Sequence, residues 1–123
     1  MEDQFKDGTY EIVGSAMKVQ NELGFGLREK PYENALAIEL EYAGFSIEQQ
    51  QAFPILYRNR PVGDCIPDIT IHSHQILVEA KAVESIGEKE IAQMLNYLRI
   101  TRFKVGLIVN FGSRKVEWKR LVL

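Results

Sequence analysis

Two acidic residues and a lysine in one short segment could together bind a divalent cation. Asp68 precedes Glu79 by eleven positions, and Lys81 follows Glu79 by two. If Asp68 and Glu79 face each other on neighbouring strands, their carboxylates lie about 5 Å apart and repel by roughly 3 kcal/mol at an effective dielectric constant near 20. Lys81 is one group that could offset this repulsion. Mg²⁺ is another, because it takes one or two carboxylates together with waters.

These residues meet if the chain reverses symmetrically in a hairpin at Ser73 and His74. Opposed residue numbers then sum to 147, so Asp68 faces Glu79. Because side chains alternate across a strand, this register separates an apolar face from a polar one, and a slip of one residue would destroy the separation. The apolar face holds Ile69, Ile71, Ile76, Val78 and Ala80, and the polar face holds Asp68, Thr70, His72, Gln75, Glu79 and Lys81.

An alternative is a solvated hairpin whose acidic and basic side chains only pair with each other. The apolar strand around Glu79 and Lys81 favours the functional interpretation, because a partly buried acid or lysine costs free energy unless it is paired or used. The histidines at the tip, His72 and His74, lie away from the acids and are expected to be solvated. Cys65 has no His or Cys partner at a zinc spacing.

Two further polar groups lie on predicted helices. Glu29 and Glu33 share a helix face with core residues, and Gln93 and Tyr97 are four residues apart on a later helix. The acids could instead stay in solvent and stabilise a helix N-terminus. Gln93 and Tyr97 could be a surface hydrogen-bonded pair, so both interpretations remain open at this point.

The hydrophobic pattern predicts a single α/β domain over residues 1–123, with a mixed sheet and the order ααβββαββ. Helices are expected over 10–23, 31–43 and 87–101. Strands are expected over 45–57, 62–72, 75–83, 104–110 and 115–122, and the first three of them are predicted to form an antiparallel meander.

Composition indicates a globular protein, with 46% hydrophobic and 26% charged residues. No apolar stretch is long enough to cross a bilayer, and the polar N-terminus and single cysteine fit a cytoplasmic protein. The net charge of −2 argues against coating nucleic acid by charge alone. The second part of the chain is basic, however, and predicts either a local phosphate-binding surface or solvated charges at Lys81, Arg99, Arg102, Lys104, Arg114 and Lys115.

Several segments resemble the GxxExxY protein family, which is similar to the PD-(D/E)XK nuclease superfamily. Residues 26–32 (GLREKPY) match the signature of the former, and further similar segments cover essentially the whole chain. Three motifs match the superfamily without substitution: Pro67-Asp68, Glu79-x-Lys81 and Gln93-x-x-x-Tyr97. The resemblance implies a restriction-endonuclease-like three-layer α/β/α core.

The resemblance also implies Mg²⁺-dependent hydrolysis of phosphodiester bonds, with Mn²⁺ as a substitute ion. Asp68, Glu79 and the Ala80 carbonyl would hold the metal with an acid from the second helix, for which Glu29 is favoured over Glu33. Lys81 would orient the attacking water or stabilise charge in the transition state. Gln93 and Tyr97 would support the phosphate or the metal ligands.

The expected partner is nucleic acid, with DNA as the expected substrate. The C-terminal strand, 116–123, could pair with a second copy as an exposed edge, which predicts a homodimer. One competing hypothesis is a nucleic-acid-binding or protein-interaction module that keeps the fold without cleaving, favoured by the acidic net charge and by the lack of an obvious DNA-gripping extension. A weaker one is an enzyme acting on another phosphorylated substrate.

Overall fold

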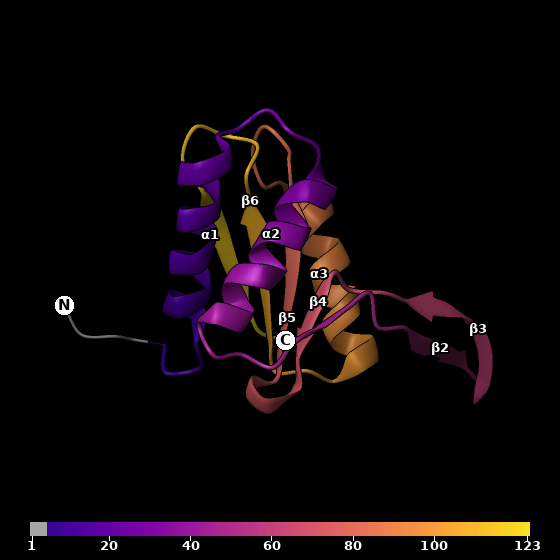
Figure 1. The fold of residues 1–123 in the computed structure, drawn as a ribbon. Coiled ribbons are helices and arrows are strands. Elements are labelled where there is room, and N and C mark those ends of the chain that lie inside the picture. Colours follow the sequence, from indigo (N-terminus) through magenta and orange to yellow (C-terminus); the bar gives the residue numbers. More distant parts are fainter. Residues whose placement is uncertain (1–4) are drawn as a thin grey trace.

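The computed structural model describes residues 5–123, which form three layers with a sheet between two helical layers (Figure 1). Helices α1 (Thr9–Leu23) and α2 (Glu29–Tyr42) cover one face of the sheet, and α3 (Glu88–Thr101) covers the other. The three-layer α/β/α prediction is therefore confirmed, and the fold is consistent with a restriction-endonuclease-like core. Each predicted helix is found within two residues of its expected ends.

The central sheet has five strands in the order β1-β4-β5-β6-β7. Its members are β1 (Glu48–Gln49), β4 (Ile69–Ile71), β5 (Ile76–Lys81), β6 (Val105–Asn110) and β7 (Glu117–Leu121). Strands β5 and β6 are parallel and are joined through α3, whereas the other pairs are antiparallel. The sheet is therefore mixed, as predicted, and β7 forms one of its edges. The homodimer through this edge stays a prediction, which sedimentation equilibrium would test.

Two predicted strands are each divided in the structure. The run 45–57 separates into β1 and β2 (Phe53–Tyr57), and the run 62–72 separates into β3 (Arg60–Cys65) and β4. Gln50 interrupts the first with a left-handed backbone (φ 58°), and Pro67, which has no N–H to donate, lies in the break of the second. The antiparallel meander predicted for the three runs is found despite these breaks: the first run pairs with the second, as β1 with β4 and β2 with β3, and the second pairs with the third, as β4 with β5. The breaks separate β2 and β3 into a two-stranded sheet of their own.

The core forms two clusters, one on each face of the sheet. The apolar face predicted for the hairpin packs beneath α1 and α2, with Ile69, Ile71, Ile76, Val78 and Ala80 all buried. On the other face, Leu77 of β5 and Ile108 of β6 pack against Met94 and Leu98 of α3. No helix within residues 5–123 is both long enough and apolar enough to span a membrane.

The end of β6 fixes the segment that follows β5. Asn110 is buried, and its side chain accepts a hydrogen bond from Val83 N (3.0 Å) and donates one to Val83 O (2.9 Å). Phe111 N donates to Lys81 O at 2.8 Å. Gly112 lies so close to Ala82 and Val83 that an added Cβ would overlap their backbone atoms. A glycine is therefore required where these two segments meet.

We expect Gly112→Ala to lower the free energy of unfolding by about 2 kcal/mol or more, because backbone cannot move aside as a flexible side chain can. Urea denaturation measures the effect. Gly14→Ala in α1 is the matched control: its added Cβ has no heavy atom within 4 Å. Because alanine favours a helix over glycine, the control should gain about 0.5–1 kcal/mol. Equal stability of Gly112→Ala and the unmodified protein would contradict the close approach.

Candidate active site

Asp68 and Glu79 meet across the β4–β5 hairpin, in the register predicted from the sequence. Ile69 pairs with Val78 and Ile71 with Ile76. Beyond this ladder, Asp68 N donates to Glu79 Oε2 at 2.6 Å, and Ala80 N donates to Asp68 Oδ2 at 2.9 Å. Each carboxylate is thus bound by a main-chain N–H of the opposite segment. The two acids are held together at the start of β4 and near the end of β5.

Burial raises the pKa of both acids, and a neighbouring negative charge adds to each shift. Glu79 is only 4% exposed, and desolvation, followed by the negative charge of Asp68, raises its pKa to about 8. Desolvation also raises the pKa of Asp68 to about 6, although the hydrogen bond from Ala80 N acts in the opposite direction. The two groups titrate as a pair, which holds on to a proton near neutral pH when no other cation is present.

Lys81 is the cation nearest to Glu79 and is held by α3. Its Nζ lies 3.8 Å from Glu79 Oε1 and donates to Gln93 Oε1 at 2.8 Å. Gln93 Nε2 in turn donates to the Tyr97 hydroxyl at 3.2 Å. Burial and the nearby Glu79 carboxylate raise the pKa of Tyr97 to about 12, so this hydroxyl keeps its proton. The Gln-x-x-x-Tyr pair is therefore connected to Lys81 and is not an isolated surface pair.

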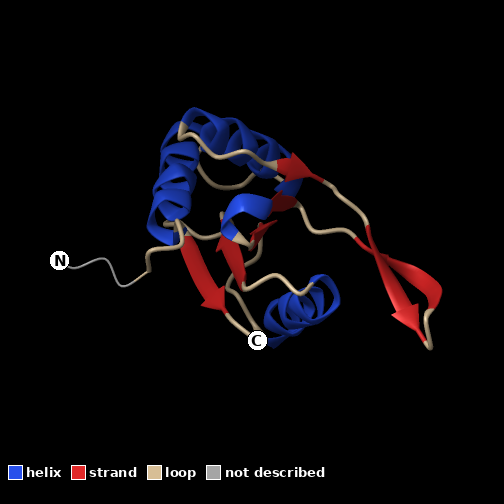
Figure 2. Ribbon diagram, turned by 90° about the horizontal axis from the view of Figure 1, so that it is seen from below, coloured by secondary structure: helices blue, strands red, loops and turns tan. Residues whose placement is uncertain are grey.

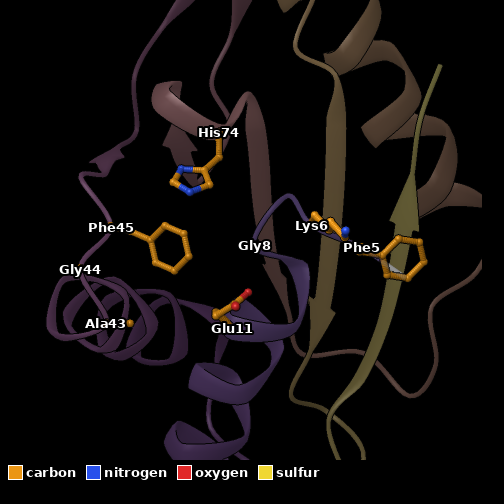
Figure 3. A pocket seen from close by; sticks show the side chains of 8 residues that line it. All are labelled: Phe5, Lys6, Gly8, Glu11, Ala43, Gly44, Phe45 and His74. Carbon is orange, nitrogen blue, oxygen red and sulfur yellow. The ribbon is translucent and has the colours of Figure 1, made fainter. Parts of the chain in front are cut away.

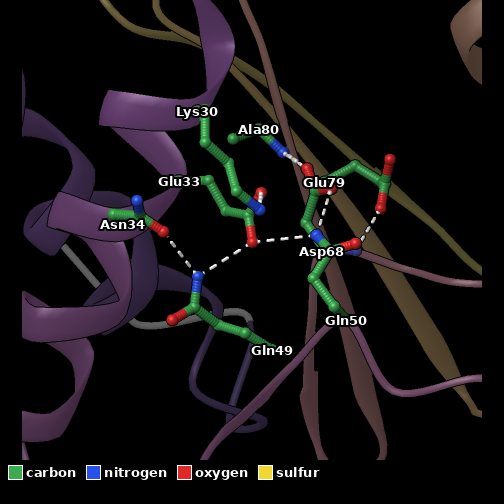
Figure 4. Close-up of polar contacts among 8 residues, drawn as sticks. All are labelled: Lys30, Glu33, Asn34, Gln49, Gln50, Asp68, Glu79 and Ala80. Carbon is green, nitrogen blue, oxygen red and sulfur yellow. Dashed lines mark hydrogen bonds and ion pairs between the residues drawn. The ribbon is translucent and has the colours of Figure 1, made fainter.

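Glu33 is the acid of α2 that lies beside Asp68. It is 3% exposed and accepts hydrogen bonds from the side chains of Lys30 (3.1 Å), Gln49 (2.9 Å) and Gln50 (3.0 Å) (Figure 4). Gln50 Nε2 also donates to Asp68 Oδ1 at 3.3 Å, so one neutral amide bridges the two carboxylates. The charge of Glu33 contributes to the raised pKa values of Asp68 and Glu79.

Glu29 lies at a different place, although the resemblance favoured it over Glu33. It is exposed at the start of α2, and its Oε2 accepts a long hydrogen bond (3.4 Å) from Ala82 N, beyond the end of β5. In this geometry the α2 acid connected to Asp68 is Glu33, and the choice of the acid that reaches a metal stays a prediction. The two residues share a helix face at i and i+4, so only the packing of α2 on the sheet distinguishes them.

Gln49 and Gln50 are the participants that the sequence did not assign to the site. Strand β1 brings them there by pairing with β4, and Gln50 N continues this pairing with a hydrogen bond to Asp68 O at 3.0 Å. Their acidic partners lie between 16 and 18 residues away in the chain. No local pattern reveals such contacts; the only signal was that these glutamines belong to a segment similar to the GxxExxY family.

The remaining candidates lie outside this cluster. His72 Nε2 shares a hydrogen bond with Gln51 Oε1 at 2.8 Å, and His74 lines a pocket of about 440 Å³ with Phe45, at the other end of the hairpin (Figure 3). Cys65 is buried, and desolvation together with the charge of Glu79 raises its pKa to about 11, so the thiol stays protonated.

The six basic residues expected to form a phosphate-binding surface occupy three separate places. Lys81 is in the site, whereas Arg99, Arg102 and Lys104 border a pocket at the C-terminal end of α3. Arg114 and Lys115 line another pocket beside α1. The sequence left open whether these residues form a local phosphate-binding surface or are solvated charges. The fold separates them, because a bias in the sequence does not determine where the folded chain places each side chain.

The donor set of the site fits a hard divalent cation. The half-buried carboxylate of Asp68 lies beside the buried carboxylate of Glu79, and among residues 5–123 the ammonium group of Lys81 is the one that forms an ion pair with Glu79. Within residues 5–123, no group of three or more His, Cys, Asp or Glu residues could hold a metal ion. Main-chain carbonyl and water oxygens would therefore have to complete the coordination, as is usual for Mg²⁺.

Comparisons with known proteins agree with this geometry. The family model described as the PD-(D/E)XK nuclease superfamily matches residues 6–121. The match thus includes all of the helices and strands of the structure. A search of the curated proteins and of the solved structures finds no significant match.

Without metal, the free energy of unfolding should fall by on the order of 2 kcal/mol as pH rises from about 5 to about 8. The folded pair keeps a proton that the unfolded carboxyl groups have already released, so rising pH favours the unfolded state. Urea denaturation in EDTA at several pH values measures this fall. Glu79→Gln should flatten it, whereas Glu84→Gln, at an exposed acid, should not. A rise in stability over the same range would contradict the raised pKa values.

Proposed function

The chain belongs to the PD-(D/E)XK nuclease superfamily, and from this premise we propose that it hydrolyses phosphodiester bonds in DNA with the help of Mg²⁺. The observation that carries the proposal is the pairing of Asp68 and Glu79 with Lys81 beside them. Two of the superfamily motifs, Pro67-Asp68 and Glu79-x-Lys81, supply these three residues. Membership of the narrower GxxExxY family stays a prediction.

Asp68 and Glu79 are the proposed metal ligands, together with the Ala80 carbonyl oxygen. A divalent ion bound here would supply an activated water and would offset negative charge on the phosphate in the transition state. The raised pKa values support this assignment, because a cation can replace the proton that the two carboxyl groups retain. Mn²⁺ is expected to substitute, since it prefers the same oxygen ligands.

Glu33 is the proposed acid from α2, in place of Glu29. Its carboxylate is buried and shares the Gln50 amide with Asp68, whereas the Glu29 carboxylate is connected to Ala82. Gln49 and Lys30 also donate to Glu33, so its orientation is fixed from three sides. We therefore assign Glu33 to support of the metal site through Gln50 and Asp68.

Lys81 is the proposed catalytic cation, which orients the water or stabilises the developing charge. Its ammonium group is held between Glu79 and Gln93, so it is positioned before substrate arrives. Gln93 is a positioning residue, and Tyr97 fixes the Gln93 amide by accepting its N–H. The protonated Tyr97 hydroxyl still has its own hydrogen to donate.

Titration calorimetry with Mg²⁺ and Mn²⁺, together with cleavage assays on single-stranded, nicked and duplex DNA, tests the function. We expect metal uptake at millimolar concentration, which Asp68→Asn should abolish because it removes a ligand charge. Lys81→Ala should lower the cleavage rate by roughly 10²–10⁴-fold while metal uptake remains.

Asp64→Asn, at an exposed acid four residues before Asp68, is the matched control and should bind metal normally. If the unmodified protein takes up no metal at millimolar concentration, catalysis is excluded and the non-catalytic module becomes the better explanation. Metal uptake with cleavage unaffected by Lys81→Ala would refute the role of the lysine alone.

Gln93→Ala should lower kcat by roughly 10–100-fold with little change in KM, because Lys81 would lose its acceptor while substrate binding remains. Gln93→Glu, which keeps an acceptor oxygen, should recover most of the rate. Asn96→Ala, on the same helix, is the control and should leave both constants unchanged. A rise in KM at constant kcat would show that Gln93 binds substrate instead of positioning the lysine.

A further inference from the structure

Strands β2 and β3 form a hairpin that projects from the three-layer body on the α3 side (Figures 1 and 2). They make a two-stranded sheet of their own, with Phe53 paired to Cys65 at its base and Tyr57 paired to Arg60 at its tip. The sequence indicated strands here but not that they leave the body. In the sequence analysis, the lack of an obvious DNA-gripping extension favoured a module that does not cleave. The projecting hairpin is an extension of that kind.

The base of this hairpin is anchored, whereas its outer part is exposed. The Phe53 ring packs edge-on against Phe103 with centroids 5.8 Å apart, and Cys65 is only 2% exposed. Farther out, Leu56, Tyr57 and Val62 are more than half exposed (55%, 67% and 63%). An anchored base gives the tip a defined direction relative to the body.

Both ends of the hairpin run directly into the candidate active site. Gln50 lies three residues before β2 begins, and Asp68 lies three residues after β3 ends. These two residues are hydrogen-bonded to each other, through Gln50 N and Asp68 O (3.0 Å) and through the Gln50 amide and Asp68 Oδ1 (3.3 Å). A molecule held by the hairpin would therefore lie at a fixed position relative to the two carboxylates.

The tip carries two arginines: Arg58 lies in the turn, where the backbone does not favour it, and Arg60 begins β3. Arg58 and Asn59 have φ angles of 52° and 64°. Two successive positive φ angles are typical of a two-residue hairpin turn in which Asn and Gly are the usual residues. An arginine in the left-handed region destabilises the folded state by about 1 kcal/mol relative to glycine. The stability of the fold therefore does not explain why an arginine occupies this position. Arg58 and Arg60 are exposed, and neither guanidinium makes a hydrogen bond or ion pair with another residue among 5–123.

We infer that the β2–β3 hairpin is an arm that inserts into a groove of duplex DNA and positions it at the active site; this inference rests on the proposed function. A two-stranded ribbon fits the major groove, which is about 12 Å wide. Arg58 and Arg60 contact phosphates or base edges, and the neighbouring Tyr57 adds an aromatic contact surface. The arm holds only one acid, Asp64, which lies next to its base.

The test is binding of a fluorescent DNA duplex in EDTA, followed by anisotropy over a range of salt concentrations. The double variant Arg58→Ala/Arg60→Ala should raise Kd by roughly 10–100-fold, and the slope of log K against log salt should become shallower by about 2. Lys18→Ala/Lys115→Ala removes the same charge from exposed positions elsewhere and should leave the slope unchanged. A thermal melt of each variant establishes that it is folded.

Unchanged DNA binding by the arginine variant overturns the inference, and so does an equal loss in the lysine control. A shift from dimer to monomer in sedimentation of the arginine variant, with DNA binding intact, also overturns it and assigns the hairpin to self-association. These outcomes are separate from the fate of the proposed function. Suppose that the protein binds no metal and cleaves no DNA, but that DNA binding is weakened by the arginine variant and not by the lysine control. The inference about the arm is then supported, and the proposed catalytic function is refuted.

Discussion

The rest of the structure depends on the confinement of two carboxyl groups, those of Asp68 and Glu79, in one partly desolvated place. Main-chain N–H groups of Asp68 and Ala80 hold them together, so the groups cannot move apart to relieve their repulsion. Desolvation raises both pKa values, and the negative charge of Glu33 acts in the same direction on each. Such an arrangement is stable only with a retained proton or a cation in place of it, and this is what makes the site chemically useful.

All three layers contribute to this confinement. Strand β5 carries Glu79 and Lys81 and lies between β4 and the parallel strand β6, so its backbone is fixed on both sides. Helix α2 supplies Glu33, which is connected to Asp68 through Gln50, and α3 supplies Gln93 for Lys81. The acids and the lysine are thus supported by different helices, from opposite faces of the sheet. A change in the packing of either helix would therefore move the acids relative to the ammonium group of Lys81.

The sequence predicted the parts of this site that depend on local periodicity. The register of the β4–β5 hairpin followed from the two-residue alternation of apolar side chains, because any other register would have buried polar groups. The choice between Glu29 and Glu33 could not be made, since both lie on one helix face and tertiary packing decides between them. The role of Gln50 could not be predicted for a different reason, because its acidic partners are distant in sequence. Its left-handed backbone also ends β1 and directs the chain into the projecting hairpin. The break at Pro67 was likewise not predicted, because residues 62–72 have the hydrophobic pattern of one continuous strand.

Under the proposed function, an acidic protein would act on a polyanion and would have to overcome repulsion near the site, so the distribution of charge matters more than the total. At physiological ionic strength, charges separated by more than about 8 Å are largely screened. The net charge of −2 is therefore less informative than the groups close to the bound substrate. Two of the acids nearest the site, Asp68 and Glu79, are the ones that a cation would neutralise, and Lys30 lies beside the third, Glu33. The lysine at the end of β5 and the arginines at the hairpin tip are then the positive groups that a substrate lying along this face would meet. The sequence total concealed this arrangement, because it gives every charge the same weight wherever the fold places it.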